Sequence, residues 1–182
     1  MQGKPVRVSI CRMNELVMPN DTNPNGTLMG GRLLYLMDIC GAIAAQRHAN
    51  TRVTTVSVDF VEFRQPIYLG EIIVLEGRVN RAFTTSMEVE IDVWAENPLT
   101  GERRRSNKAF YTFVGIDEQG HPTRIPPVIP ETDLEKKRYH NAARRRELRL
   151  IMAGRLRLEE AVNLRDDLQA LLEPKSEEPT NP

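Results

Sequence analysis

Residues 30–48 read GGRLLYLMDICGAIAAQRH, and this stretch decides the fold. Between positions 32 and 46 it is almost wholly apolar, so a helix formed here has no polar face and we expect it to be buried all round. Its one internal charge is Asp38. An ionised carboxylate is costly in such surroundings unless it is paired, hydrogen-bonded or reached by solvent. Asp38 is therefore either a structural carboxylate bonded to a neighbouring strand or a functional group at the wall of a cleft.

The composition indicates one domain without a strong net charge. The chain has 182 residues, and 25 lysine and arginine residues balance 25 aspartate and glutamate residues. No overall field draws the protein toward nucleic acid or an anionic membrane, so we expect neither as a partner. Cys11 and Cys40 lack the spacing of metal ligands, and the N-terminus lacks the apolar core of a signal peptide. We expect a reduced, cytoplasmic protein without a metal ion.

A shaped loop precedes the buried helix. Residues 6–18 alternate loosely and predict a first strand, which ends at the cluster PNDTNPNG at positions 19–26. Proline, asparagine and glycine each fix or permit particular backbone angles, so this density of them predicts a loop with a defined shape. The loop leads to Gly30 and Gly31, whose lack of side chains would let a ligand approach the free amides at the start of the helix.

Four strands are predicted after the helix, at residues 52–64, 71–80, 87–94 and 108–116. Within 52–64 the apolar phase shifts by one residue, which indicates a β-bulge or burial of both faces. Residues 87–94 alternate strictly between apolar and mostly acidic side chains, so we expect one face in the core and the other in water. This order of elements predicts an α+β fold in which an antiparallel sheet curls around one central helix.

The C-terminal part differs in composition. The proline-rich residues 122–130 predict an extended linker. From position 132 onward charged residues alternate with leucines at helical spacing, which predicts one or two amphipathic helices. We expect their apolar stripe to pack on another subunit, with packing on the chain's own sheet as the alternative. The polar residues 173–182 predict a disordered tail.

Several of these motifs together resemble the hotdog-fold acyl-CoA thioesterases of the cytosolic acyl-CoA hydrolase type. The resemblance rests on DTNPNG at 21–26, on Gly30-Gly31, on Met37-Asp38 at the family's spacing, and on VTTVSVD at 53–59, FRQP at 63–66 and AFYTFV at 109–114. It covers about residues 6–149. It implies a hotdog domain at 1–130, in which an antiparallel β-sheet wraps around a long central helix. The C-terminal helical extension at 131–172 is predicted from its composition, and the residues from Leu150 onward lie outside the resemblance.

The resemblance also implies an activity, which is hydrolysis of acyl-CoA to free fatty acid and coenzyme A. Its functional pair falls on Asn23 and Asp38, which act across a dimer interface, one from each subunit. It therefore implies a homodimer, commonly gathered as a trimer of dimers. Asp38 would serve as general base or as nucleophile, and these two roles stay open. Backbone amides at Gly30 and Gly31 would stabilise a developing oxyanion, although close helix packing explains these glycines equally well.

Coenzyme A enters this reaction as part of the substrate, and no separate cofactor is expected. Its phosphates call for basic groups near the mouth of the site, for which the candidates are Arg64, Arg81, Arg103, Arg104 and Lys108, with ordinary solvated charge as the alternative for each. Thr84, Thr85 and Ser86 are candidates for contact with the pantetheine arm. We interpret His48, together with Arg47, as a cation that complements the helix dipole.

Other functions are less compatible with the sequence. It contains no G-x-S-x-G serine elbow, P-loop or dinucleotide fingerprint. A hotdog dehydratase is expected to use a histidine near this helix, where the chain has Asp38. The competing hypothesis from another class is a non-catalytic acyl-CoA-binding module or regulator, in which the C-terminal helices contact a partner.

Overall fold

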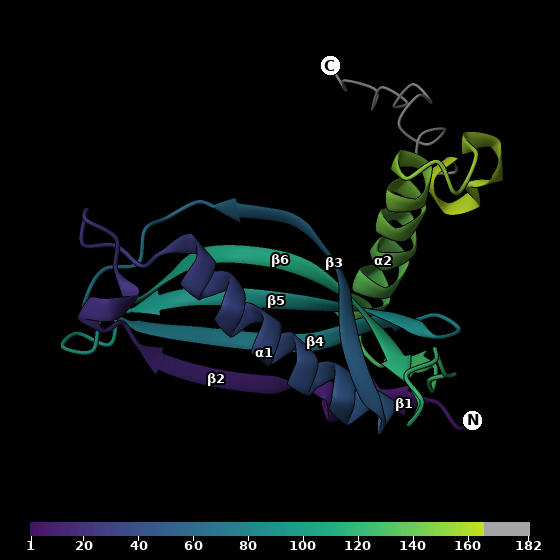
Figure 1. The fold of residues 1–182 in the computed structure, drawn as a ribbon, viewed down its shortest axis with the longest axis horizontal. Helices are drawn as coiled ribbons and strands as arrows, with labels where there is room; N and C mark the ends of the chain where they lie inside the picture. The colour runs from purple at the N-terminus through teal and green to yellow at the C-terminus, as the bar shows by residue number, and fades with distance from the viewer. Residues whose placement is uncertain (166–182) are drawn as a thin grey trace, which may run out of the picture.

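The structure is a computed structural model that describes residues 1–165 (Figure 1). Its elements, in chain order, are β1 (Lys4–Pro5), η1 (Val6–Ser9), β2 (Cys11–Leu16), η2 (Pro19–Asp21), α1 (Gly30–Ala49), β3 (Arg52–Phe63), β4 (Ile72–Ala82), β5 (Ser86–Glu96), β6 (Arg103–Ile116), β7 (Val128–Ile129), α2 (Asp133–Met152) and η3 (Leu158–Glu160). The predicted central helix and the four strands after it are confirmed. The last strand begins earlier than predicted, at Arg103.

Five strands form one antiparallel sheet in the order β2-β4-β5-β6-β3. The sheet curves, and α1 lies across its concave face (Figure 1). The register between β3 and β6 shifts twice, at Thr55/Ser57 and at Asp59/Glu62, so the bulge predicted from the phase change is confirmed. This arrangement is the expected α+β hotdog fold, and within residues 1–165 it leaves β3 as an edge strand that pairs on one side only.

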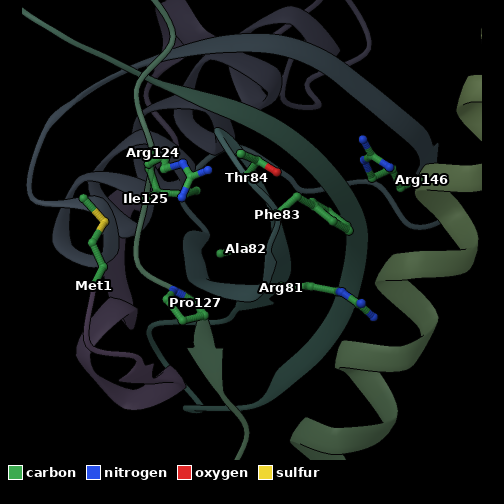
Figure 2. A pocket seen from close by; sticks show the side chains of 9 residues that line it. All are labelled: Met1, Arg81, Ala82, Phe83, Thr84, Arg124, Ile125, Pro127 and Arg146. Atoms are coloured by element: carbon green, nitrogen blue, oxygen red, sulfur yellow. The ribbon is translucent and has the colours of Figure 1, made fainter.

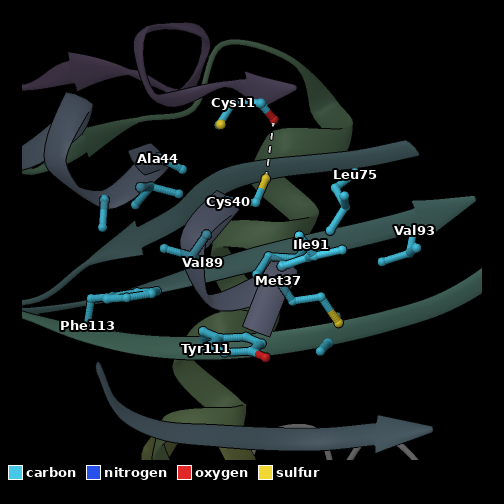
Figure 3. Packing of buried hydrophobic residues seen from close by; sticks show 14 of the residues in the cluster. Cys11, Met37, Cys40, Ala44, Leu75, Val89, Ile91, Val93, Tyr111 and Phe113 are labelled. Atoms are coloured by element: carbon cyan, nitrogen blue, oxygen red, sulfur yellow. Dashed lines mark hydrogen bonds between the residues drawn. The ribbon is translucent and has the colours of Figure 1, made fainter. Parts of the chain in front are cut away.

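The core lies between α1 and the concave face of the sheet. Met37, Cys40 and Ala44 of α1 pack against buried apolar residues of β4, β5 and β6 (Figure 3). Gly41 lets the helix approach the sheet closely, because a Cβ atom there would lie 2.9 Å from the ring of Phe113. Burial of this apolar face is the main force that fixes α1 on the sheet.

The expectation that α1 is buried all round was wrong. Gly31 and Tyr35 are exposed and Asp38 is half-buried, and these residues lie along one stripe of the helix. Tyr35 keeps 55% of its surface exposed. The edge strand β3 also exposes apolar side chains, with Val56 at 55% and Val58 at 44%. One stripe of α1 and the outer edge of β3 are therefore left open in the described part of the single chain.

The acidic face of β5 is not in water, contrary to the prediction. Glu88, Glu90 and Asp92 are 2%, 1% and 3% exposed. Basic side chains cover them, because Arg145 of α2 binds Glu88 at 2.7 Å and Arg78 binds Asp92 at 2.7 Å. Alternation along a strand predicts which face is apolar and which is polar, but it does not show whether the polar face is covered by water or by arginine side chains.

The first helix of the extension is α2, which covers Asp133–Met152 and begins with the capping box of Thr132 and Glu135. Ala142 and Ala143 are buried, and Arg145 reaches β5, so this part of α2 packs on the chain's own sheet, which was the alternative. Glu147 then accepts hydrogen bonds from Asn163 and from the backbone of Leu164. Residues 166–172 of the predicted helices and the predicted disordered tail at 173–182 lie outside the described residues.

Three smaller predictions need correction. Residues 6–9 form the 3-10 helix η1 rather than the start of the first strand. The stretch 122–130 is docked rather than a free linker, since β7 pairs in parallel with β1 and Ile125 is buried. His48 is fully buried, where it binds the carbonyl oxygen of Pro126 at 2.8 Å. Burial lowers the pKa of His48, so it is neutral and does not complement the helix dipole as a cation.

Within residues 1–165, none of the helices combines the length and the apolar character that a membrane span requires.

Candidate active site

Asn23 is held by its own loop. Its Oδ1 accepts hydrogen bonds from the backbone of Asn25 at 2.9 Å and of Thr27 at 3.3 Å, and its Nδ2 donates to the Thr27 hydroxyl at 2.9 Å. Gly26 has φ of +73°, a conformation that favours glycine. These bonds fix the amide in one orientation, which a functional side chain also requires.

The first turn of α1 is free to bind a ligand. No side chain caps the helix, and among residues 1–165 no group accepts a hydrogen bond from the amides of Gly30 and Gly31. A Cβ atom on Gly30 would lie 3.1 Å from the ring of Phe63, whereas one on Gly31 would meet nothing within 4 Å. Free amides at a helix N-terminus are suited to stabilise negative charge.

Two clefts lie next to this turn. The first, which we call the Asn23 cleft, measures about 360 Å³ and includes Asn23, Gly30, Leu33, Phe63 and Ile67 in its lining. The second, which we call the Asp38 cleft, measures about 410 Å³ and is lined by Gly31, Leu34, Tyr35, Asp38, Val58, Val61 and Tyr111. Asn23 and Asp38 thus lie in different clefts of one chain, and the Gly30-Gly31 step contributes one residue to each.

Asp38 is the charged group of an otherwise apolar cleft. The hydroxyl of Thr55, on β3, donates to Asp38 Oδ1 at 2.7 Å. No other hydrogen bond to this carboxylate comes from the described part of the chain, so Oδ2 is available to water or substrate. Burial and then the charge of Asp38 raise the pKa of the Tyr111 phenol, which is therefore protonated. The Asp38 carboxylate is both bonded to a strand and open to a cleft, so the two roles drawn from the sequence are compatible.

Thr55 is the site residue that the sequence did not reveal. It stands in a run of β-branched residues that predicted only a strand. Its contact with Asp38 joins two residues that are 17 positions apart, across the packing of α1 on β3. Only the alternation of the strand could have placed Thr55 on a particular face, and the bulge after it removes that signal.

The predicted coenzyme-binding residues are distributed over several places. Arg81 and Thr84 line one cavity of about 480 Å³ at the end of the β4–β5 hairpin (Figure 2). Thr85 and Ser86 belong to the same hairpin, but they are not among the residues that line this cavity. Lys108 forms an ion pair with the buried Glu90 at 2.5 Å, which already neutralises its charge.

The remaining basic candidates are at the other end of the sheet. Arg104 binds Glu71 at 2.6 Å, and this hydrogen bond lowers the pKa of the Glu71 carboxyl. Arg103 forms an ion pair with Glu96. Arg64 is exposed just after β3. For Arg103 and Arg104, structural ion pairs are therefore the simpler explanation.

A curled sheet around one helix, with a carboxylate and free helix amides at adjacent clefts, defines the hotdog class of thioesterases. Comparison with known proteins agrees, since residues 25–102 match the family model of the thioesterase superfamily. A Bacillus subtilis protein named as an uncharacterized acyl-CoA thioester hydrolase, YkhA, is 41% identical over 127 residues, which are 70% of this chain and 73% of that protein. The YciA hydrolase of Escherichia coli is 37% identical over 63% of this chain and 89% of its own length. The chain therefore belongs to the hotdog-fold acyl-CoA thioesterases, which confirms the resemblance drawn from the sequence.

Longer relatives and solved structures extend this comparison. The cytosolic acyl coenzyme A thioester hydrolase of Rattus norvegicus is 37% identical over 68% of this chain, but the match spans only 33% of that protein. A crystal structure of an apo hexameric acyl-CoA thioesterase superposes with a TM-score of 0.82 and 41% identity over 86% of this chain and 100% of that one. An acyl-CoA hydrolase from Staphylococcus aureus, solved with butyryl coenzyme A and coenzyme A, gives a TM-score of 0.78 at 33% identity over 92% of this chain and 98% of its own. These relatives are hydrolases, which favours an enzyme over a non-catalytic binding module.

Proposed function

We propose that this protein hydrolyses acyl-CoA thioesters to the free acid and coenzyme A, at sites built by two copies of the chain. Asp38 comes from one subunit and Asn23 from the other, and the amides of Gly30 and Gly31 belong to the helix turn that lines both clefts. The observation that carries this proposal is the division of these groups between two separate clefts in the single chain. Only a second copy would bring an Asn23 cleft against an Asp38 cleft.

The open face of the chain supports such a dimer. The edge strand β3 has unpaired backbone groups on one side, and the apolar side chains of Val56, Val58 and Tyr35 are exposed beside it. A free sheet edge with exposed apolar residues readily pairs with another strand. A two-fold axis at β3 would join the two copies through the same surface and create two equivalent sites. Since three matched thioesterases are described as hexameric, we extend the proposal to a trimer of dimers.

The reaction needs only protein groups and water. Asp38 either removes a proton from water as the water attacks the thioester carbonyl, or attacks that carbon itself to give an anhydride that water then opens. The carbonyl oxygen gains negative charge in either case, and the amides at Gly30 and Gly31 would stabilise it. The carbon–sulfur bond then breaks, and coenzyme A leaves as the thiolate and takes up a proton. Asn23 would orient the water or the thioester.

Thr55 joins this proposal as a positioning residue. Structures of the Staphylococcus aureus hydrolase include variants in which an aspartate, an asparagine and a threonine are each replaced by alanine. The asparagine precedes the aspartate by 15 positions and the threonine follows it by 17, which are the spacings of Asn23, Asp38 and Thr55 here. This agreement supports the assignment of all three residues to one site.

The test is thiol release from a panel of acyl-CoAs by the wild type and by Asp38→Ala and Asn23→Ala, with Asp133→Ala as the control. Asp133 is a suitable control because its side chain is almost fully exposed and, among residues 1–165, pairs only with Lys136. We expect each site variant to lose on the order of a hundredfold in turnover or more. An Asp38→Ala variant that folds and keeps wild-type turnover would contradict the assignment, and wild-type protein that retains acyl-CoA without releasing thiol would support the binding module.

Subunit mixing tests the shared site. When the two inactive variants exchange subunits, each mixed dimer regains one intact site, so part of the activity should return. If exchange is demonstrated and no activity returns, both residues act within one chain. We also propose a cytoplasmic location, as the name of the rat relative states for that protein.

A further inference from the structure

An ion pair joins the end of α2 to the strand that carries Thr55. Arg149 stands in the last turn of α2, and its guanidinium binds the carboxylate of Asp59 on β3, 90 positions earlier in the chain. The pair is mostly buried, since the side chains of Arg149 and Asp59 are 24% and 14% exposed. The hydroxyl of Ser57 also donates to Asp59 at 3.3 Å. Because Arg145 holds the same helix on β5, Arg149 extends to β3 from a helix that is already fixed on the sheet.

The strand β3 presents active-site residues on one face and this ion pair on the other. Thr55 donates to Asp38 at 2.7 Å, and Val58 lines the Asp38 cleft. Both residues lie opposite core residues of β6, so they face α1. Ser57 and Asp59 lie opposite the alternate residues of β6, so they face the other side of the sheet. The group that positions Asp38 and the group that α2 binds therefore both lie within residues 55–59 of one strand.

This part of β3 is interrupted as a ladder. The register with β6 shifts between Thr55 and Ser57 and again between Asp59 and Glu62, which leaves residues 57–59 as a short paired stretch between two irregularities. A bulge disrupts the ladder locally and changes the direction in which neighbouring side chains point. A charge-assisted hydrogen bond from a fixed helix adds a constraint that the interrupted ladder does not supply.

We infer that Arg149 is a positioning residue for the hydrolysis, because it fixes β3 through Asp59 and β3 in turn fixes the Asp38 carboxylate through Thr55. The inference rests on the proposed function. It gives α2 an effect on turnover, although no residue of this helix lines the Asp38 cleft. It also predicts that the effect of Arg149 passes through the Thr55 hydroxyl and is lost when that hydroxyl is absent.

The test measures kcat for thiol release from butyryl-CoA by Arg149→Met, alone and together with Thr55→Val. Residues that act on a site without touching its ligand change rates by about two- to thirtyfold, and we expect Arg149→Met to lower kcat within this range. In the Thr55→Val background, Arg149→Met should change kcat by less than about twofold, because the two substitutions remove the same constraint. Arg149→Lys keeps the charge and should retain most of kcat.

The matched control is Arg138→Met, which should leave kcat unchanged. Arg138 lies on the same helix and its side chain is also 24% exposed, but it pairs with Glu90 on β5 rather than with β3. A double variant, Arg149→Met with Asp59→Asn, separates positioning from stability. It leaves no unpaired buried charge, so it should resist thermal unfolding better than Arg149→Met, while its kcat stays as low. If Arg149→Met does not fold, this double variant replaces it in the comparison with Thr55→Val.

Three results would overturn the inference. They are an unchanged kcat in Arg149→Met, the same fold loss from Arg149→Met in the wild-type and Thr55→Val backgrounds, and a kcat that recovers together with stability in the double variant. Each of them would assign Arg149 to folding alone and would leave the proposed hydrolysis intact, since the wild type still releases thiol. A wild type that releases no thiol would refute the hydrolysis itself, and the inference with it.

Discussion

The hydroxyl of Thr55 offers a sharp test of how Asp38 is positioned. Thr55→Val keeps the shape of the side chain and removes the hydroxyl that donates to Asp38 Oδ1 at 2.7 Å. This distance is typical of a hydrogen bond to a charged oxygen, which contributes roughly 1.5–3 kcal/mol. If the whole contribution acts in the transition state, kcat should fall by about ten- to a hundredfold.

Two other variants separate the hydroxyl from its surroundings. Thr55→Ser restores a hydroxyl in the same place and should recover most of kcat. Thr54→Val is the matched control on the same strand, because Thr54 is exposed and makes no hydrogen bond through its side chain within residues 1–165. Thiol release gives kcat and KM for each variant, and thermal unfolding shows whether each one folds.

Two results would refute this reasoning. A Thr55→Val variant with kcat within about twofold of the wild type would mean that the hydrogen bond does not matter in the transition state. Equal losses in Thr55→Val and Thr55→Ser would mean that the β-branched shape matters rather than the hydroxyl. A loss of stability without a loss of kcat would assign Thr55 to folding alone.

Three further predictions concern α1. Gly41→Ala should lower the free energy of unfolding by about 1–3 kcal/mol, measured by denaturant titration, because the new methyl group would lie 2.9 Å from Phe113; unchanged stability would contradict the close packing. Gly30→Ala should lower kcat/KM about tenfold, because its methyl group would lie 3.1 Å from Phe63 in the Asn23 cleft. Adding Phe63→Ala to the same chain should restore part of the lost kcat/KM. Wild-type kinetics in Gly30→Ala would refute this prediction. Burial lowers the pKa of His48, so the unfolded chain takes up this proton first as the pH falls, and the free energy of unfolding should decrease below about pH 6.5. In His48→Gln, the free energy of unfolding should decrease less steeply between the ordinary histidine pKa and the lower pKa that His48 has in the folded protein. An unchanged dependence of this free energy on pH would show that His48 does not cause the decrease.

The sequence predicted those elements that are marked by a run or a regular repeat of residue types, or by turn residues within one short segment. The apolar run at 30–48 and the alternation at 87–94 were sufficient for α1 and β5, because burial alone decides such patterns. The Asn23 loop was recognisable from its turn residues. The resemblance to a family, rather than the pattern itself, assigned a function to Asn23 and Asp38.

The parts that the sequence did not predict depend on which distant segment covers a residue. The burial of Glu88 follows from Arg145, which is 57 positions later, and His48 is buried against the carbonyl oxygen of Pro126, which is 78 positions later. Thr55 became a site residue only through its contact with α1. The exposed stripe at Tyr35 was missed because an apolar surface that stays exposed in the single chain has the same composition as a core.

The row of carboxylates under α2 limits how this sequence can change over generations. Loss of one member of a buried ion pair costs about 3–5 kcal/mol, because the other charge stays behind without a partner. A domain with a total stability of about 5–15 kcal/mol has little room for such a step. An apolar replacement of both partners together is often tolerated. Positions 88 and 145 should therefore vary as a pair among descendants of this chain, and a lineage that carries the pair can lose it only through a less stable intermediate.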